Sequence, residues 1–143
     1  MMKAEIITIG DELLIGQVVD TNSAWLAEQL TMIGIQVQQI TSISDSRKHI
    51  LTTLEEAAQR AGIILLTGGL GPTKDDITKH TLCEYFDTEL VFHEESFKNV
   101  ERLFRQRGFE VTELNRQQAE IPAAAEPLPN PNGTAPGRWF EKE

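Results

Sequence analysis

The chain has 143 residues, 40% of them hydrophobic, which is enough for one ordinary core and gives no sign of a second. Its formal net charge is −9, and no stripe of lysine or arginine is present, which argues against recognition of nucleic-acid phosphates. The single cysteine excludes an intramolecular disulfide, and neither a secretory leader nor a long apolar run is recognisable. We therefore expect a single cytoplasmic domain over residues 1–143, with no nucleic-acid or membrane partner.

The first half of the chain alternates predicted strands and helices. The β-branched run 4–10 predicts a buried strand that ends at Gly10. Asp20 can cap a helix that ends at Gly34, and the mixed pattern of residues 35–43 indicates a strand near a sheet edge. The helix that follows Asp20 has its apolar positions at Leu26, Ala27, Leu30 and Ile33. A second helix, capped by Asp45 or Ser46 and ending at Gly62, has the stripe Ile50, Leu51, Leu54, Ala57, Ala58 and Ala61.

The second half begins with a strand that leads into a glycine-rich loop. The continuous apolar run 63–66 predicts a strand that is covered on both faces. A third helix is expected to begin near Asp76, and a fourth to end before Gly108. Residues 121–137, rich in proline, glycine and asparagine, indicate an ordered ligand loop or a linker, and residues 138–140 could open another strand. The third helix is expected to bury Leu82, Tyr85 and Phe86. The fourth is expected to bury Phe97, Val100, Leu103 and Phe104.

This alternation of elements predicts a three-layer α/β/α domain with a mostly parallel sheet. In such sheets, ligands bind beyond the carboxyl ends of the strands. Two segments are expected at those ends: Gly10-Asp11-Glu12, and the loop that runs from Gly68 to Asp76. The sequence stops three residues after the candidate strand 138–140, so we also expect the domain to be truncated at its C-terminus.

The glycines of Gly68-Gly69-Leu70-Gly71 stand between a strand and a helix, where bare backbone can approach a phosphate. Neither the Walker A pattern nor the dinucleotide fingerprint is present, because Lys74 occupies the place of the third glycine of the fingerprint. The alternative interpretation is a turn that only reverses the chain. Asp75 and Asp76 favour a ligand site, because a divalent cation bridging carboxylates and a phosphate would suit an acidic pocket.

Other candidates are weaker when taken alone. Asp20 is expected to be a helix cap, and the loop 130–137 offers backbone amides and the Thr134 hydroxyl. Cys83 is expected to be a buried small hydrophobe. His49, His80 and His93 lack the spacing of zinc ligands, and no role is assigned to them.

Four motifs in order resemble CinA, the competence/damage-inducible family, over nearly the whole chain. They are Ile9-Gly10-Asp11-Glu12-Leu13-Leu14-Ile15-Gly16, Asp20-Thr21-Asn22, the stretch from Thr67 to Thr78, and Asn132-Gly133-Thr134-Ala135-Pro136-Gly137. The resemblance implies a molybdopterin-binding fold similar to MogA, MoaB and gephyrin-like domains. CinA proteins usually carry a further C-terminal domain that deamidates nicotinamide mononucleotide.

The resemblance also implies roles for acidic residues. Asp76 and Thr78 match residues of the molybdopterin enzymes, in which that aspartate takes part in metal-assisted adenylyl transfer. Asp75 stands where those enzymes have arginine, which fits the implied hydrolysis of ADP-ribose by CinA rather than molybdopterin adenylylation. Asp20 matches an acidic residue near the family's first helix.

The function predicted first is therefore that of a metal-dependent pyrophosphatase acting on ADP-ribose or a related nucleotide. The alternatives are a non-catalytic nucleotide- or pterin-binding module, and an interaction domain with a purely structural glycine loop. Magnesium, manganese or cobalt is the expected cofactor, potassium is a further candidate, and a homo-oligomer is expected. The residues expected to be catalytic are Asp76, Asp20 and Asp75. The expected metal ligands are Asp20 and Asp76. A water molecule could be oriented by Asp11, Glu12 or Asp75. The residues expected to bind the ligand are Gly10, Asp11, Glu12, Thr67, Gly68, Gly69, Gly71, Pro72, Thr73, Lys74, Thr78, Asn132, Gly133, Thr134, Ala135 and Gly137.

Overall fold

A computed structural model describes residues 1–69 and 72–142, with side chains at all of these except residues 72–76. The chain forms two compact units, Met1–Gly69 and Leu70–Glu143, which are described in turn. Within the described residues, no helix has both the length and the apolar character needed to cross a membrane.

The first unit is built on a parallel sheet whose strand order is β2-β1-β3. The strands are β1 (Lys3–Ile9), β2 (Gln36–Ile43) and β3 (Ile63–Gly68). Every residue of β1 after Lys3 is buried, because β1 has a neighbouring strand on each side. The predicted edge position of β2 is confirmed for this sheet. Strand β3 lies at the other edge of this sheet, and all six of its residues are half-buried, so the complete burial expected of a strand covered on both faces is not found.

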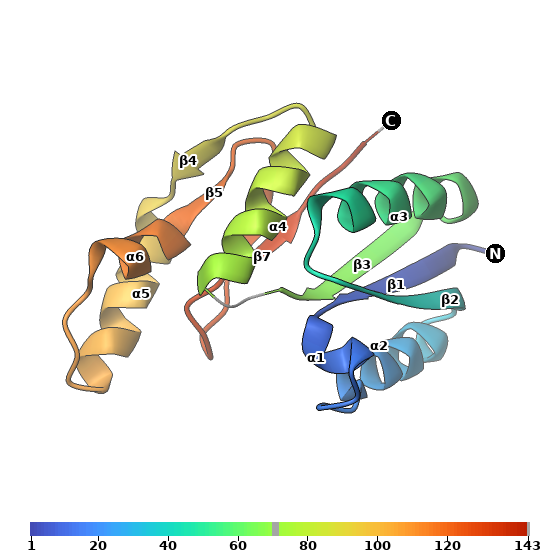
Figure 1. Ribbon diagram of the computed structural model, residues 1–143, viewed down its shortest axis with the longest axis horizontal. Coiled ribbons are helices and arrows are strands. Elements are labelled where there is room, and N and C mark those ends of the chain that lie inside the picture. Colours follow the sequence, from blue (N-terminus) through green and yellow to red (C-terminus); the bar gives the residue numbers. More distant parts are fainter. Residues whose placement is uncertain (70–71, 143) are drawn as a thin grey trace. The chain divides into compact units, whose positions relative to one another are not determined.

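Helices cover both faces of this sheet, as the α/β/α prediction requires (Figure 1). The short α1 (Asp11–Leu14) and the longer α2 (Thr21–Met32) lie on one face, and α3 (Arg47–Arg60) lies on the other. The hydroxyl of Ser46 accepts a hydrogen bond from the His49 N–H at 3.1 Å and caps α3. Ile50, Leu54 and Ala57 of α3 and the isoleucines of β1 form the core of this unit.

Further details of this unit differ from the sequence prediction, among them Ala58, which was assigned to the buried stripe of α3 and is exposed. No helix was predicted at α1, because four residues are too few to show a helical period. Ile33, assigned to the buried stripe of α2, is 71% exposed, because the helix ends at Met32 and Ile33 follows it as the C-cap. Asp20 does cap α2, as predicted.

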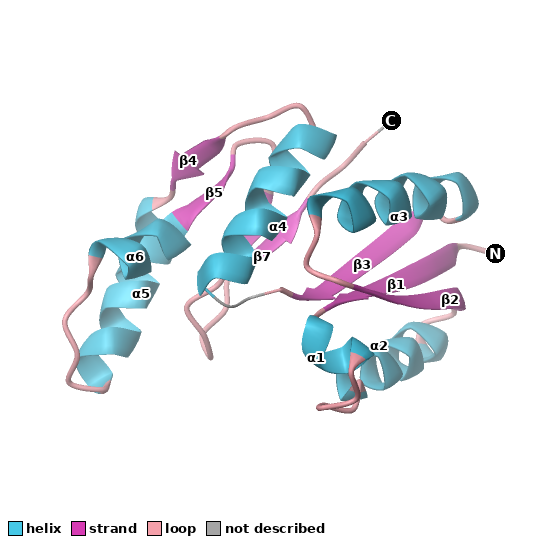
Figure 2. Cartoon of the chain, viewed as in Figure 1, coloured by secondary structure: helices cyan, strands magenta, loops and turns pink. Residues whose placement is uncertain are grey.

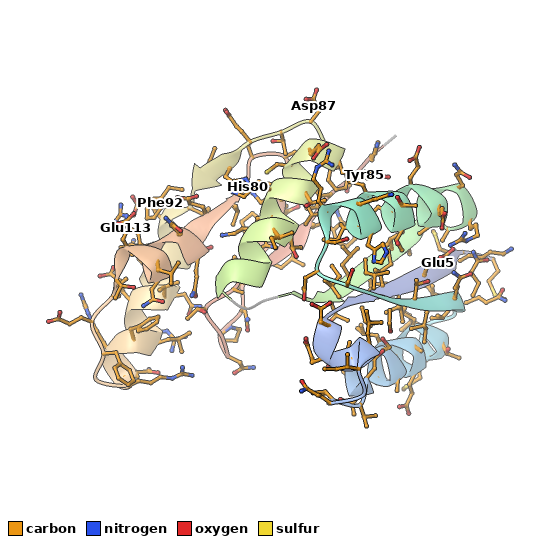
Figure 3. All side chains as sticks on the ribbon, viewed as in Figure 1. Glu5, His80, Tyr85, Asp87, Phe92 and Glu113 are labelled. Carbon is orange, nitrogen blue, oxygen red and sulfur yellow. The ribbon has the colours of Figure 1, made fainter. Side chains whose placement is uncertain are left out.

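A buried carboxylate ties the sheet to α3. Glu5 of β1, labelled in Figure 3, is only 1% exposed. Its carboxylate accepts hydrogen bonds from Nε and Nη2 of Arg60, each at 2.8 Å. The Gln38 amide of β2 donates to the same carboxylate at 2.9 Å. The bonds from Arg60 hold the pKa of Glu5 below its ordinary value, against the opposing effect of burial.

The second unit combines helices with two antiparallel strand pairs (Figure 2). Its helices are α4 (Pro72–Tyr85), α5 (Glu94–Gln106), α6 (Glu113–Arg116) and the 3-10 turn η1 (Gln117–Ala119). Strand β4 (Leu90–Phe92) pairs with β5 (Glu120–Pro122), and β6 (Glu126–Leu128) pairs with β7 (Gly137–Trp139). Residues 121–137 are thus partly strand, not only loop or linker, and the strand predicted near Trp139 is confirmed.

The core of the second unit lies against α4 and α5. Val100 and Leu103 of α5 are buried, as predicted, and Ile121 of β5 is buried as well. Lys79 of α4 is 4% exposed, and its ammonium group donates to the carbonyls of Gln117 at 2.9 Å and Glu120 at 3.3 Å. Cys83 is a free buried thiol, as predicted, and burial raises its pKa.

Candidate functional site

A pocket of about 150 Å³ lies at the carboxyl ends of β1 and β3, entirely within the first unit. This is the edge of a parallel sheet at which ligands bind in α/β domains. Strands β1 and β3 contribute hydroxyl and backbone groups, α1 contributes Glu12, and the start of α2 contributes Asp20. The lining residues are Thr8, Ile9, Glu12, Leu13, Val18, Val19, Asp20, Thr21, Asn22, Thr67 and Gly68.

The backbone after β1 turns at once into α1 and then doubles back to α2. The Gly10 N–H donates to the Ile43 carbonyl of β2 at 3.0 Å, which fixes the exit from β1. The Glu12 carbonyl then accepts from the N–H groups of Gln17, at 2.9 Å, and Val18, at 3.3 Å. These bonds return the chain towards the sheet, so that Glu12 and Asp20 line one pocket although eight positions separate them in the sequence.

Two carboxylates line this pocket. Asp20 Oδ1 accepts the Ser23 N–H at 3.1 Å, so the helix cap uses one of its two oxygens. The carboxylate of Glu12 lies directly over the α-carbon of Gly10, where a Cβ would stand 2.5 Å from Glu12 Oε1. Gly10 therefore leaves room for Glu12. Gly10 and the exposed Asp11 were both predicted to bind ligand, but neither lines the pocket.

The glycine at the end of β3 is required by the packing of the sheet. Gly68 has φ of +94°, and a Cβ there would overlap the Ile9 carbonyl oxygen of β1. Gly69 has φ of +65°, also in the region that favours glycine. Gly68 lines the pocket, as predicted. However, the close approach of β1 already requires a glycine at this position, whether or not a ligand binds there. The alternative interpretation of this loop as a structural turn therefore accounts for Gly68.

Much of the predicted glycine-loop site lies outside the described residues. Leu70 and Gly71 are not described, and neither are the side chains of Pro72, Thr73, Lys74, Asp75 and Asp76. The backbone corrects one expectation, because α4 begins at Pro72 and not near Asp76. Proline suits the first turn of a helix, since it lacks an N–H that would have no helical partner there. The two aspartates are therefore the fourth and fifth residues of α4 and do not precede it. Thr78 is buried, at 5% exposure.

The loop 130–137 belongs to the second unit. Thr134 lines a separate pocket there, beside α5, which is described below. The other predicted ligand residues of this loop, Asn132, Gly133, Ala135 and Gly137, are not among the lining residues of that pocket.

Sequence reasoning missed several residues at these sites. Thr8 lines the pocket but was not named as a ligand residue. Its position near the end of the predicted first strand was the only signal for such a role. Thr21 and Asn22 line the pocket beside Asp20, and their motif was quoted without a role for them. His93, to which no role was assigned, caps α5, where its Nδ1 accepts the Ser96 N–H at 3.2 Å. A histidine is an uncommon cap, so its sequence signal was weak.

The donor atoms of the first pocket suit a hard divalent cation. Among the described residues, no group of three or more His, Cys, Asp or Glu is placed to hold a metal ion. Magnesium does not need such a cage, because it is usually bound by one or two carboxylates together with substrate phosphates and water. Glu12, Asp20 and the threonine hydroxyls offer oxygen ligands of this kind.

The fold is that of an α/β domain with a pocket beyond the carboxyl ends of its parallel strands. A family model described as "Probable molybdopterin binding domain" matches residues 5–143. A CinA-like protein of Cytophaga hutchinsonii is 53% identical over 138 residues, which cover 96% of this chain and 33% of that protein. A second, from Flavobacterium psychrophilum, is 48% identical over 99% of this chain and 34% of its own length. The chain belongs to this molybdopterin-binding-domain family, as a CinA-like member, and spans about a third of the curated relatives.

Solved structures support the same assignment. The CinA protein of Thermoplasma acidophilum is 31% identical, with a TM-score of 0.82 over 95% of this chain and 79% of that one. The tungsten cofactor synthesizing protein MoaB of Pyrococcus furiosus shares the fold, with a TM-score of 0.57 at 23% identity over 85% of this chain. The predicted MogA/MoaB-like fold is therefore confirmed.

Proposed function

We propose that this chain is the metal-dependent nucleotide pyrophosphatase domain of a CinA-type protein, acting on ADP-ribose or a related nucleotide. The observation that carries the proposal is the pocket at the ends of β1 and β3, into which two separate elements bring Glu12 and Asp20. Carboxylates at the N-terminal end of a helix, next to hydroxyl groups, suit a diphosphate held through a cation. The membership of the CinA-like family supports the choice of ADP-ribose.

The charge of this pocket determines how a diphosphate could bind. Of the described residues that line it, none is lysine or arginine, and two are carboxylates. The N-terminus of α2 attracts an anion, but its partial positive charge is only about half an elementary charge. Asp20 and Glu12, with Asp76 as a third candidate from the family resemblance, would hold the divalent cation. Such a cation would supply charge neutralisation and a more acidic bound water.

The reaction is hydrolysis of the diphosphate. The oxygen of a water molecule forms a bond to one phosphorus, and the bond from that phosphorus to the bridging oxygen breaks. The products are AMP and ribose 5-phosphate, and one water is consumed. The role of the chain is to orient the diphosphate along the N-terminus of α2 and to accept the proton of the water at a carboxylate, for which Glu12 and Asp75 are candidates, whereas Asp11 is exposed outside the pocket.

The test is to incubate the chain with ADP-ribose and magnesium, manganese or cobalt, and to separate the products by ion-exchange chromatography. We expect AMP and ribose 5-phosphate in equal amounts. Asp20→Asn should slow the reaction by about 100-fold, because it removes a cation ligand but keeps a good helix cap. The matched control is Glu28→Gln, an exposed carboxylate on α2 outside the pocket, which should leave the rate unchanged. Equal rates for Asp20→Asn and wild type would exclude Asp20 from the mechanism.

The second candidate is a binding module that holds a pterin or nucleotide without hydrolysing it. The description of the matching family as a molybdopterin binding domain favours this candidate. The same experiment separates the two, because a module would bind ADP-ribose or a pterin in a titration but release no AMP with any of the three metals.

A further inference from the structure

The second unit contains a larger pocket, of about 350 Å³, between α5 and the segment 127–136. This volume falls in the range of pockets that bind small molecules. On one side the wall is apolar, formed by Pro127, Leu128, Pro129, Pro131 and Pro136. The helix α5 and its cap contribute the polar residues His93, Glu95, Ser96, Asn99 and Arg102, and the loop adds Thr134. All of these residues belong to one unit, and the proposed function uses none of them.

The pocket is held open by hydrogen bonds between α5 and the loop. Asn99 Nδ2 donates to the carbonyls of Asn130, at 2.9 Å, and Gly133, at 3.0 Å. Asn130 Nδ2 in turn donates to the Ala135 carbonyl at 2.9 Å and closes the loop on itself. The proline rings add stiffness, because each fixes one backbone torsion. The loop is therefore fixed at several points without filling the space beside the helix.

Arg102 is the cation of this pocket, and it is held in a defined orientation. Its Nη2 donates to Asn99 Oδ1 at 2.7 Å and to the Pro131 carbonyl at 3.2 Å. A guanidinium carries five N–H donors in a rigid plane, so a second edge remains for a planar or tetrahedral anion. Residues 95, 99 and 102 are spaced at helical intervals, so α5 presents them on one face. Glu95 is an acidic residue of the same pocket, and its charge disfavours a ligand that carries more than one negative charge.

We propose that this pocket binds a small molecule with one anionic group, a carboxylate or a phosphate, attached to a compact ring. The anionic group pairs with Arg102, and the ring packs on the prolines and Leu128. A rigid apolar wall next to an oriented guanidinium selects for both features together, since a ligand with only one of them leaves part of the pocket poorly matched. The inference goes beyond the proposed function, and its test does not depend on hydrolysis of ADP-ribose.

The test is a titration of the full chain, labelled with ¹⁵N, with phenyl phosphate and phenylacetate, and with benzyl alcohol as the neutral probe. The readout is the set of amide signals of Gly133, Thr134 and Ala135. We expect saturable shifts with at least one anion, with a dissociation constant of about 1 mM or tighter, and much weaker shifts with benzyl alcohol. The anion that binds more tightly identifies the source of the charge as phosphate or carboxylate.

Two variants and a control connect the shifts to the pocket. Arg102→Gln should weaken binding by about tenfold or more. Arg105→Gln is the matched control, because Arg105 lies on the same helix, pairs with Glu101 at 3.3 Å and does not line the pocket. Thr134→Phe should abolish the shifts by filling the space without removing a charge, and thermal melts check that each variant is folded. The absence of shifts with both anions, equal shifts with benzyl alcohol, or unchanged affinity in Arg102→Gln would overturn the proposal.

Discussion

Glu5 is the residue whose charge most clearly contributes to folding. Its buried carboxylate accepts two bonds from Arg60 and one from Gln38, and its folded pKa lies below the ordinary value of 4.5. The stabilisation is therefore complete above about pH 4.5 and is lost as the pH falls through the lower folded pKa. We expect Glu5→Gln to lower the free energy of unfolding at pH 7 by about 1–2 kcal/mol.

Urea unfolding of wild type and Glu5→Gln at several pH values measures this effect. The difference between the two proteins should shrink as the pH falls below the ordinary carboxyl pKa, because both then carry a neutral group at position 5. A difference that stays constant from neutral to strongly acidic pH would contradict the electrostatic explanation. Glu55→Gln on α3, an exposed carboxylate, is the control and should show little change at any pH.

Asp20 combines two roles that substitutions can separate. Its Oδ1 caps α2 through the Ser23 N–H, and its carboxylate lines the pocket. Asparagine caps a helix about as well as aspartate, whereas alanine does not. We expect Asp20→Ala to lower the free energy of unfolding by about 1 kcal/mol, with Asp20→Asn close to wild type. Chemical denaturation of the three proteins gives these values, and equal losses in the two variants would show that charge, not capping, matters at this position.

At the scale of elements, the junction between β3 and β1 depends on a single glycine. We expect Gly68→Ala to lower the free energy of unfolding by about 2 kcal/mol or more, because the new Cβ would overlap the Ile9 carbonyl and the backbone has positive φ. Gly62→Ala, just before β3, is the matched control, since its Cβ would meet only Met2 Sδ at 3.6 Å. Thermal melts compare the two, and a Gly68→Ala variant as stable as Gly62→Ala would contradict this role.

The elements themselves could largely be predicted, because their signals are local. The stripe of Ile50, Leu54 and Ala57 and the cap at Ser46 identify α3, and the run from Ala4 to Ile9 identifies β1. The start of α4 was misplaced because two aspartates resembled caps more strongly than Pro72 resembled a first helical residue. The complete burial of β3 was also predicted wrongly, since an apolar run does not show how fully the rest of the fold covers the strand.

The candidate site was predictable only in part. Asp20, Glu12, Thr67 and Gly68 were named from the sequence and line one pocket, because strand ends and helix caps have recognisable signals. The polar wall made by Asn99 and Arg102 could not be predicted, because it depends on tertiary contacts between α5 and a loop about thirty positions further along the chain. The contribution of Asp76 remains a prediction, since its side chain lies outside the described residues.

At the scale of the whole molecule, the net charge of −9 leads us to expect that binding of a diphosphate depends on a cation. The two negative charges of the diphosphate would approach Glu12 and Asp20, and no lysine or arginine is among the described residues that line their pocket. Coulomb repulsion at about 4 Å amounts to several kcal/mol near a protein surface unless a cation is present. A site that used only the dipole of α2 would instead weaken with salt and be indifferent to metal removal.

The measurement that tests the metal-bridged site most directly is one calorimetric titration of ADP-ribose at fixed ionic strength. It is carried out with magnesium, manganese or cobalt, and repeated with EDTA. We predict that EDTA weakens binding by about 100-fold or more, because the diphosphate then meets uncompensated carboxylates. Unchanged affinity in EDTA would contradict the metal-bridged site, and would leave Asp20 as a helix cap beside a pocket that binds its ligand without a cation.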